Sequence, residues 1–225
     1  MSSASSPYLN SYNIVSSCAI KEKSMGRASG GLAIFIHKSF DYKVLEIAPW
    51  WIICLISWKH YKFVVCSVYF KPSFVVNEFK YLLETLKKCL TGILDKFNCI
   101  PFIIGGDFNS RISDLNLIPV DVLEGANLFE SRLSSDIVIN SRGKYLLDLM
   151  SINSLSVVNG RSPGDWPGQF THISSLGNSV IDLVWPVLPP VLFLTSYVNL
   201  NVTMDYQLSS CLGNEVYGCA GKSPN

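Results

Sequence analysis

Charge is scarce in this 225-residue chain, and neither sign dominates. Lys and Arg number 18 and Asp and Glu number 17, so charged residues make up 16% of the sequence and the formal net charge is +1. This balance excludes a broadly basic nucleic-acid-binding surface, so any surface for nucleic acid must be local. Disorder is disfavoured because 48% of the residues are hydrophobic, which is enough for one domain with a sizeable core.

The cysteine spacings of a zinc site or a disulfide frame are also missing. The seven cysteines are Cys18, Cys54, Cys66, Cys89, Cys99, Cys211 and Cys219. Their number is odd, and no two of them form a C-x-x-C pair. Cys54 and Cys66 fall inside apolar strand patterns, so we expect buried thiols in a reducing compartment, either cytoplasmic or nuclear.

Targeting and membrane-spanning signals are not evident. The first ten residues, MSSASSPYLN, have neither the basic region nor the apolar region of a signal peptide. Residues 183–204 are uncharged and apolar, but Pro186, Pro189 and Pro190 disfavour a spanning helix. We therefore expect strands joined by a loop here, and no membrane partner.

Hydrophobic periodicity predicts many strands and two helices. Runs rich in β-branched and aromatic residues predict strands near residues 12–15, 32–40, 44–47, 51–58, 62–70, 102–104, 156–159, 169–173, 179–185 and 191–202. A three- and four-residue apolar period predicts an amphipathic helix over 76–97. Asn140 or Ser141 caps a second helix with Leu146 on its inner side. Strand hairpins with two covering helices indicate an α+β sandwich, two sheets packed together with helices outside.

One stretch, FIIGGDFNSR at residues 102–111, organises the chain. It reads as a short buried strand that runs through two glycines to Asp107, Phe108 and Asn109. Alternation places Asp107 and Asn109 on one face and Phe108 on the other. An acid and an amide at a strand end suit a water molecule and a phosphate oxygen. A turn with Asx-type hydrogen bonds is the alternative interpretation.

Five short signals stand in a fixed order along the chain. They are GGLAI (30–34), VYFKP (68–72), GGDFNSR (105–111), NSRG with two leucines (140–147), and NG, FT and SVIDL (159–183). Together they resemble the endonuclease/exonuclease/phosphatase superfamily, and most closely the endonuclease domain of LINE-type (non-LTR) retrotransposons. Sphingomyelinases, inositol polyphosphate phosphatases and deadenylases share the GDFN-like element. The resemblance covers residues 26–207.

The resemblance implies a deoxyribonuclease-like, four-layer α/β/β/α sandwich. The implied activity is hydrolysis of DNA phosphodiesters with Mg²⁺ or Mn²⁺, in a protein linked to a reverse transcriptase in the parent element. The implied organisation is a loose entry at 1–25, the domain at 26–208 and an unstructured tail at 209–225. The match begins near residue 26, so we expect a chain truncated at its N-terminus that lacks the family's first strand and the segment with the metal-binding glutamate.

The resemblance also implies roles for particular residues. Asp107 orients or deprotonates the attacking water, and Asn109 holds a phosphate oxygen. Tyr69 binds the phosphate or stabilises the leaving group. Asp182 orients a histidine of the last motif, as a carboxylate fixes an imidazole tautomer.

Several of these positions have simpler interpretations. Thr171 and Ser179 are expected to hydrogen-bond around Asp182, but both could be ordinary strand residues. Tyr69 could be a half-buried packing residue. Arg142 is interpreted as a solvated charge at a helix start. The histidines, which we read as non-catalytic, are His37, His60 and His172.

Two departures from the family pattern predict an impaired copy. The only acid before the first motif is Glu22, and its setting, KEKS, does not match the metal-binding segment. In the last motif Asp205 occupies the aspartate position and could touch the metal, but Tyr206 replaces the histidine. A tyrosine with its usual pKa of about 10 cannot act as a base at neutral pH as an imidazole can. The alternatives are a non-catalytic remnant or binding module of the same fold, and an unrelated sandwich with a coincidental DFN.

Overall fold

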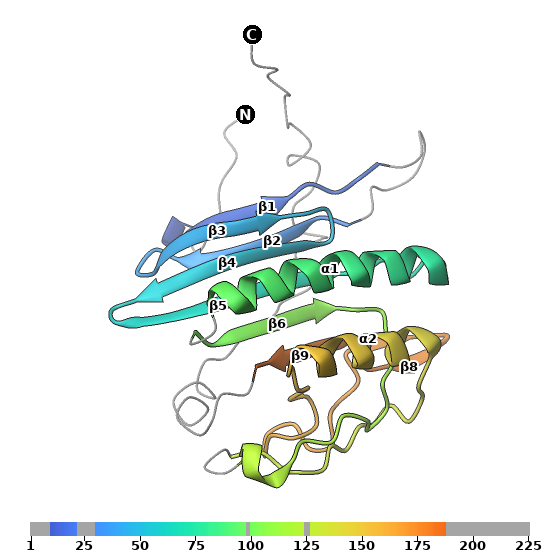
Figure 1. Ribbon diagram of the computed structural model, residues 1–225. Helices are drawn as coiled ribbons and strands as arrows, with labels where there is room; N and C mark the ends of the chain where they lie inside the picture. The colour runs from blue at the N-terminus through green and yellow to red at the C-terminus, as the bar shows by residue number, and fades with distance from the viewer. Residues whose placement is uncertain (1–9, 22–29, 98–99, 124–126, 188–225) are drawn as a thin grey trace.

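A computed structural model describes residues 10–21, 30–97, 100–123 and 127–187 of the chain (Figure 1). Its central five-stranded sheet has the order β3-β4-β5-β6-β9. The bounds of these strands are Asp41–Ile47, Trp51–Trp58, Tyr61–Tyr69, Phe102–Asp107 and Asp182–Pro186. A two-stranded sheet pairs β1 (Tyr12–Ser17) with β2 (Leu32–His37), and a small hairpin pairs β7 (His172–Ser174) with β8 (Gly177–Ser179).

Helix α1 (Val76–Lys96) provides the crossover between two parallel strands. β5 and β6 run parallel, and all other neighbouring pairs of the central sheet are antiparallel. A parallel pair needs a long connection, and the amphipathic α1 supplies it while covering the sheet. Helix α2 (Ser141–Ile152) packs beside α1 on the same face (Figure 1), and a 3-10 turn (Val120–Leu123) lies in the loop that precedes it.

Two hydrophobic cores lie on the two faces of the central sheet. The larger one joins the helices to strand residues such as Ile104, Val68 and Trp185. The smaller one joins Ile52, Cys54 and Ile56 of β4 to the β1–β2 sheet. Helices, central sheet and second sheet therefore stack in that order, which confirms the expected α+β sandwich. Within the described ranges no α-helix covers the outer face of the β1–β2 sheet.

The prediction of a strand over 156–159 is wrong. This segment runs beside β9, where Val158 N–H donates to the Val184 carbonyl at 3.0 Å. The return bond is missing because Val184 N–H donates instead to the Asn159 side-chain oxygen at 2.8 Å. A side chain has taken the place of the main-chain carbonyl, so no regular ladder forms.

The strand predicted over 179–185 is interrupted. β8 ends at Ser179 and β9 begins at Asp182. The N–H groups between them donate to side chains, Val180 to Asp136 and Ile181 to Thr171, rather than to a neighbouring strand. The strand expected over 169–173 is likewise displaced to β7, and the one expected over 191–202 lies outside the described residues.

The predicted second helix and the buried thiols are confirmed. Asn140 is the N-cap of α2, because its side chain accepts a hydrogen bond from Gly143 N–H at 2.7 Å. Cys54 and Cys66 are buried thiols that form no disulfide. Neither α1 nor α2, the α-helices of the described ranges, has the length and apolar composition that crossing a bilayer requires.

Candidate active site

Tyr69, Asp107 and Asp182 form one row across three neighbouring strands. Tyr69 on β5 is the register partner of Asp107 on β6, and Asp107 is the register partner of Asp182 on β9. Side chains directly opposite one another on paired strands lie about 4.5–5.5 Å apart at Cβ. Three residues separated by up to 113 positions in the sequence (182 minus 69) are therefore neighbours.

All three side chains project from the face of the sheet that points away from the helices. Ile104 of β6, Val68 of β5 and Leu183 of β9 belong to the core beneath the helices. Strand side chains alternate between the two faces of a sheet. Each of Tyr69, Asp107 and Asp182 is an odd number of positions from the core residue of its own strand, so all three lie on the other face. This is the face that the β1–β2 sheet covers over β4 and β5.

The two glycines before Asp107 allow the strands to approach closely. Gly106 has φ +150°, and a Cβ atom added to it would lie 1.9 Å from the Val68 carbonyl oxygen on β5. Only a residue without a side chain fits there. Phe108 then turns into the helix-side core, where it is fully buried against Phe70. The predicted alternation of Asp107 and Phe108 is therefore present.

Asn109 lies in a tight turn after the strand. Its φ is +45°, in the left-handed region that Asn tolerates better than most residues. Its backbone N–H donates to Asp107 Oδ1 at 2.9 Å, and its Nδ2 donates to the Phe70 carbonyl at 2.8 Å. The Asx-type turn of the alternative interpretation is thus formed. It places the Asn109 carboxamide directly beside the Asp107 carboxylate.

Thr171 and Ser179 lie around Asp182 in different ways. Thr171 Oγ1 accepts hydrogen bonds from the backbone N–H groups of Ile181 and Asp182, both at 3.1 Å. Ser179 is buried and contributes its carbonyl, which accepts the Thr171 N–H at 3.0 Å. Burial raises the pKa of Asp182, and His172 on the exposed strand β7 lies close enough to oppose this increase.

Burial makes the negative charges of this row unfavourable. Desolvation and then the charge of Asp182 raise the pKa of Asp107 from 3.8 to about 7, against the opposing hydrogen bonds from Asn109. Burial also raises the pKa of Asp182, and burial and the charge of Asp107 raise the pKa of Tyr69. Two carboxyl groups that oppose each other in a half-buried row favour a shared proton or a bound cation.

The interpretation of Arg142 as a solvated charge is wrong. Its guanidinium donates to the carbonyls of Phe74 at 2.7 Å, Lys71 at 3.2 Å and Asn109 at 3.4 Å, and stacks over the Phe79 ring at 4.8 Å. It therefore joins the segments that follow β5 and β6. Burial lowers the pKa of Arg142, and the nearby Asp107 opposes this.

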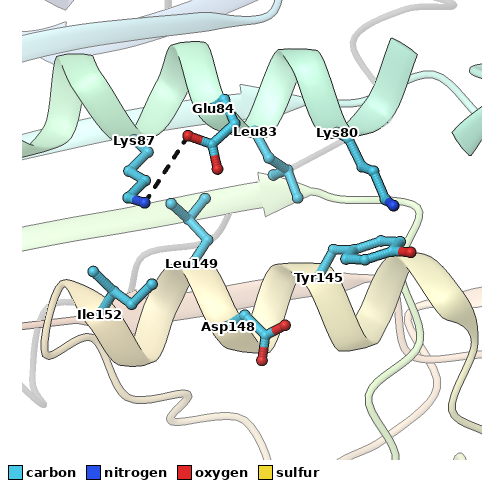
Figure 2. A pocket seen from close by; sticks show the side chains of 8 residues that line it. All are labelled: Lys80, Leu83, Glu84, Lys87, Tyr145, Asp148, Leu149 and Ile152. Atoms are coloured by element: carbon cyan, nitrogen blue, oxygen red, sulfur yellow. Dashed lines mark ion pairs between the residues drawn. The ribbon is translucent and has the colours of Figure 1, made fainter. Parts of the chain in front are cut away.

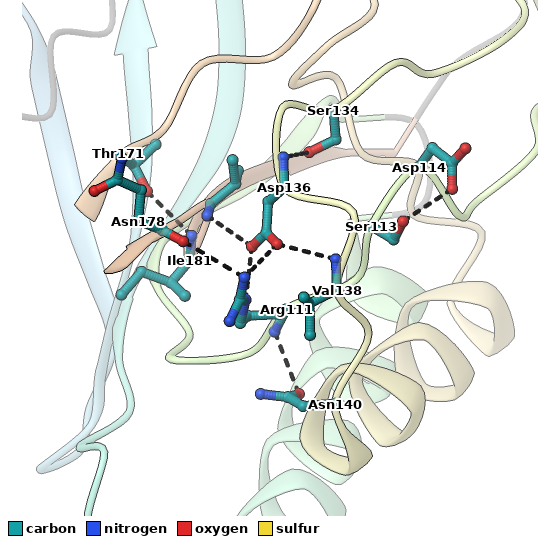
Figure 3. A network of polar contacts seen from close by, with 11 residues as sticks. Arg111, Ser113, Asp114, Ser134, Asp136, Val138, Asn140, Thr171, Asn178 and Ile181 are labelled. Atoms are coloured by element: carbon teal, nitrogen blue, oxygen red, sulfur yellow. Dashed lines mark hydrogen bonds and ion pairs between the residues drawn. The ribbon is translucent and has the colours of Figure 1, made fainter. Parts of the chain in front are cut away.

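Buried charges between residues 111 and 161 were not predicted from the sequence. Arg161 is fully buried and donates to the carbonyls of Val157, Phe129, Glu130 and Asn116. Asp136 is buried and forms a bidentate pair with Arg111 (Figure 3). In the sequence these residues are visible only as charges in a stretch that has neither strand nor helix periodicity. Such a stretch usually indicates a solvated loop.

A groove lies on the helix side of the sheet, opposite to the row of Tyr69, Asp107 and Asp182. The groove between α1 and α2 has a volume of about 260 Å³ and is lined by Leu83, Leu149 and Ile152 with lysines and acids at its rim (Figure 2). Lys80 lies over the Tyr145 ring at 4.4 Å, and Lys87 pairs with Glu84 at 3.9 Å. None of its lining residues belongs to the row of Tyr69, Asp107 and Asp182.

The donor atoms of the row are of the kind that Mg²⁺ prefers. Two carboxylates and a carboxamide supply hard oxygens, and Mg²⁺ commonly uses one or two carboxylates with water and a substrate phosphate. In the described part of the chain no three His, Cys, Asp or Glu side chains form a metal-binding group. Asp205 and Tyr206, the residues assigned to the last motif, lie outside the described residues, as does Glu22.

Several solved structures have a similar fold. The endonuclease domain of TRAS1, a telomere-specific non-LTR retrotransposon, matches with 16% identity and a TM-score of 0.47, over 76% of this chain and 66% of that domain. The human Nocturnin catalytic domain matches with 15% identity and a TM-score of 0.49, over 80% and 63%. An endonuclease/exonuclease/phosphatase family protein from Bacteroides thetaiotaomicron matches with 14% identity and a TM-score of 0.42, over 79% and 62%.

This chain spans just under two thirds of the length of the TRAS1 and Nocturnin domains. No protein-family model and no curated protein sequence matches the chain.

Proposed function

We propose that this chain is the endonuclease-type domain of a retrotransposon-derived protein, which hydrolyses phosphodiester bonds in DNA with Mg²⁺ and does so slowly. The observation that carries the proposal is the row of Tyr69, Asp107 and Asp182 on one face of the sheet, with Asn109 bonded to Asp107. These are the residues that the motif order assigned to the chemistry. A coincidental DFN turn gives no reason for Asp182 to oppose Asp107.

The side chains of the row suit attack of water on a phosphodiester. The Asp107 carboxylate has a pKa of about 7, so it can accept a proton from water at neutral pH and later release it. Tyr69 keeps its proton and can donate it in a hydrogen bond to a phosphate oxygen or to the leaving oxygen. The Asn109 carboxamide, fixed by its turn, lies where a second phosphate oxygen can bind.

A divalent ion fits the donor set of this site. Asp182 is the described carboxylate that would hold it, with Asp205 as the further ligand expected from the motif, while Asp107 would orient the attacking water beside it. When bound, the ion supplies positive charge that neutralises the phosphate. The raised pKa values of the two buried acids agree with a site that favours a cation.

Slow turnover follows from the departure in the last motif. Tyr206 occupies the position of the histidine there. Loss of one general acid–base group typically costs about 10²- to 10⁴-fold in rate. Membership of a protein that also carries a reverse transcriptase, and an intracellular location, are parts of the same proposal.

Nicking of supercoiled plasmid DNA tests the proposal. We expect slow Mg²⁺-dependent nicking that disappears in Asp107→Ala and in EDTA, and that increases in Tyr206→His. Asp114→Asn is the control because Asp114 is an exposed carboxylate seven residues after Asp107, on the loop that follows β6. The absence of nicking in both the wild type and Tyr206→His would contradict the enzyme proposal and favour a non-catalytic remnant, whose nucleic-acid binding a filter assay then measures.

A further inference from the structure

An ion pair between the half-buried Arg111 and the buried Asp136 lies beside the candidate active site. Arg111 Nε and Nη2 donate to the two Asp136 carboxylate oxygens at 2.8 and 2.6 Å (Figure 3). The Asp136 side chain is 1% exposed and that of Arg111 is 31% exposed. Burial of such a pair is costly in desolvation, so its remaining hydrogen-bonding capacity must be used.

The remaining capacity of Asp136 is used by the backbone that leads to Asp182. Asp136 Oδ2 accepts the Val180 N–H at 3.0 Å, across 44 positions of sequence, and Oδ1 accepts the Val138 N–H at 3.0 Å. Arg111 also donates to the Asn178 carbonyl at 3.4 Å, and its backbone N–H donates to Asn140 at 3.3 Å. One ion pair therefore joins the end of β6, the start of α2, the β7–β8 hairpin and the start of β9.

The segment between β8 and β9 depends on side chains for its position. Val180 and Ile181 belong to no strand, and their N–H groups donate to Asp136 and Thr171 respectively. The Ile181 carbonyl accepts the Phe108 N–H at 3.0 Å, directly after Asp107. One backbone hydrogen bond and these side-chain contacts hold the segment, and both of its N–H groups depend on side chains that lie just before the point where Asp182 pairs with Asp107.

We propose that the Arg111–Asp136 pair is a positioning device that holds Asp182 opposite Asp107 for phosphodiester hydrolysis. Its catalytic consequence rests on the proposed function, but its effect on the position of Asp182 does not. Neither Arg111 nor Asp136 belongs to the row of side chains that would contact the phosphate. Asp136 remains charged in this setting, since the hydrogen bonds from Arg111 and two N–H groups lower its pKa despite the opposing effect of burial.

The test compares two variants of the pair with a matched control in the full chain. Asp136→Asn removes the charge and one acceptor oxygen, and Arg111→Lys keeps the charge but loses the bidentate fork. Asp114→Asn is the control, because Asp114 lies in the same loop, is exposed, and accepts only from its neighbour Ser113 among the hydrogen bonds of Figure 3.

The first measurement is amide hydrogen exchange. We expect exchange at Val180, Ile181 and Asp182 to accelerate by at least about tenfold in Asp136→Asn, and less in Arg111→Lys, while the α1 amides keep their protection. Unchanged exchange at these three amides in both variants would overturn the proposal. If Asp136→Asn does not fold, Arg111→Lys decides the result.

The second measurement is the split of nicking kinetics between kcat and KM. A misplaced Asp182 should lower kcat by about 10- to 100-fold and leave the KM for DNA within about twofold. A purely structural role would instead reduce the amount of active protein and the protection of α1 together, and would overturn the proposal. If neither the wild type nor Tyr206→His nicks DNA, the proposed function fails, and hydrogen exchange alone then decides whether the pair positions Asp182.

Discussion

At the scale of single residues, the ionised form of Asp107 is unfavourable in its own site. Burial and the opposing Asp182 raise its pKa from 3.8 to about 7. The folded protein therefore binds this proton more tightly than the unfolded chain does. The resulting contribution to stability is complete below about pH 4 and is lost as the pH rises to about 7.

Asp107→Asn should therefore become more stabilising as the pH rises. Asn is neutral at every pH and keeps an oxygen that can accept the Asn109 N–H. We expect the gain in free energy of unfolding over the wild type to grow between pH 4.5 and pH 8, by at most about 4 kcal/mol. Urea denaturation in EDTA measures it. A gain that is the same at both pH values would contradict the assignment, and Asp114→Asn controls for the change in net charge.

At the scale of elements, the contact between β5 and β6 leaves no room for a side chain at Gly106. Gly106→Ala would place a Cβ 1.9 Å from the Val68 carbonyl oxygen, so we expect a loss of roughly 3 kcal/mol or more. Gly92→Ala is the matched control, because an added Cβ in this exposed turn of α1 meets nothing within 4 Å. That change should stabilise the protein by about 0.5–1 kcal/mol. Thermal unfolding compares the stability of the two variants. Equal changes in stability would contradict the steric conflict at Gly106.

Helix α1 derives its stability from one buried face. Leu86 is fully buried in the larger core, whereas Tyr81 of the same helix is 77% exposed. Leu86→Ala should destabilise by about 2–5 kcal/mol through lost burial and a residual cavity. Tyr81→Ala should change stability by less than about 0.5 kcal/mol. Chemical denaturation of the two variants measures both effects. A larger loss of stability in Tyr81→Ala than in Leu86→Ala would contradict this orientation of α1.

At the scale of the whole molecule, the β1–β2 sheet protects the second face of the central sheet. Ile36 on β2 is 5% exposed and packs on the smaller core, while Ile14 on β1 is 51% exposed. Ile36→Asp should bury an unpaired carboxylate or detach the sheet, with a loss of about 3–5 kcal/mol and increased binding of a hydrophobic dye. Ile14→Asp is the control, and similar dye binding in both variants would contradict this packing.

At the same scale, the candidate active site and the α1–α2 groove lie on opposite sides of the central sheet. The helices cover one face of the central sheet and leave the α1–α2 groove on their outer side (Figure 2). The carboxylates project from the opposite face. The candidate chemistry therefore belongs to the face between the sheets, and the groove between the helices is separate from it.

Local patterns in the sequence were sufficient for the larger elements. The 21-residue helix α1 follows the apolar period over 76–97, and β4 and β5 follow dense β-branched runs. They were predictable because the pattern repeats within a short window and packing agrees with it. The turn at Asp107, Phe108 and Asn109 was predictable for the same reason.

The irregular segments near the site were not predictable in this way. The strand expected over 156–159 fails because the Asn159 side chain replaces a main-chain acceptor, and the break before Asp182 exists because Asp136 and Thr171 take its N–H groups. Arg142 was misread because its carbonyl partners, Lys71 and Phe74, lie about 70 residues earlier in the sequence. Each of these contacts joins residues that are distant in sequence.

Sequence alone was enough to identify which side chains are available for chemistry and which strands and helices carry them, because alternation and periodicity depend on neighbours along the chain. The tertiary structure was needed to show that Tyr69, Asp107 and Asp182 stand in one row, and that Arg111 pairs with Asp136 beside it. Register between strands is a property of pairs, and it is set by the close approach at Gly106 and by buried hydrogen bonds that no single segment encodes.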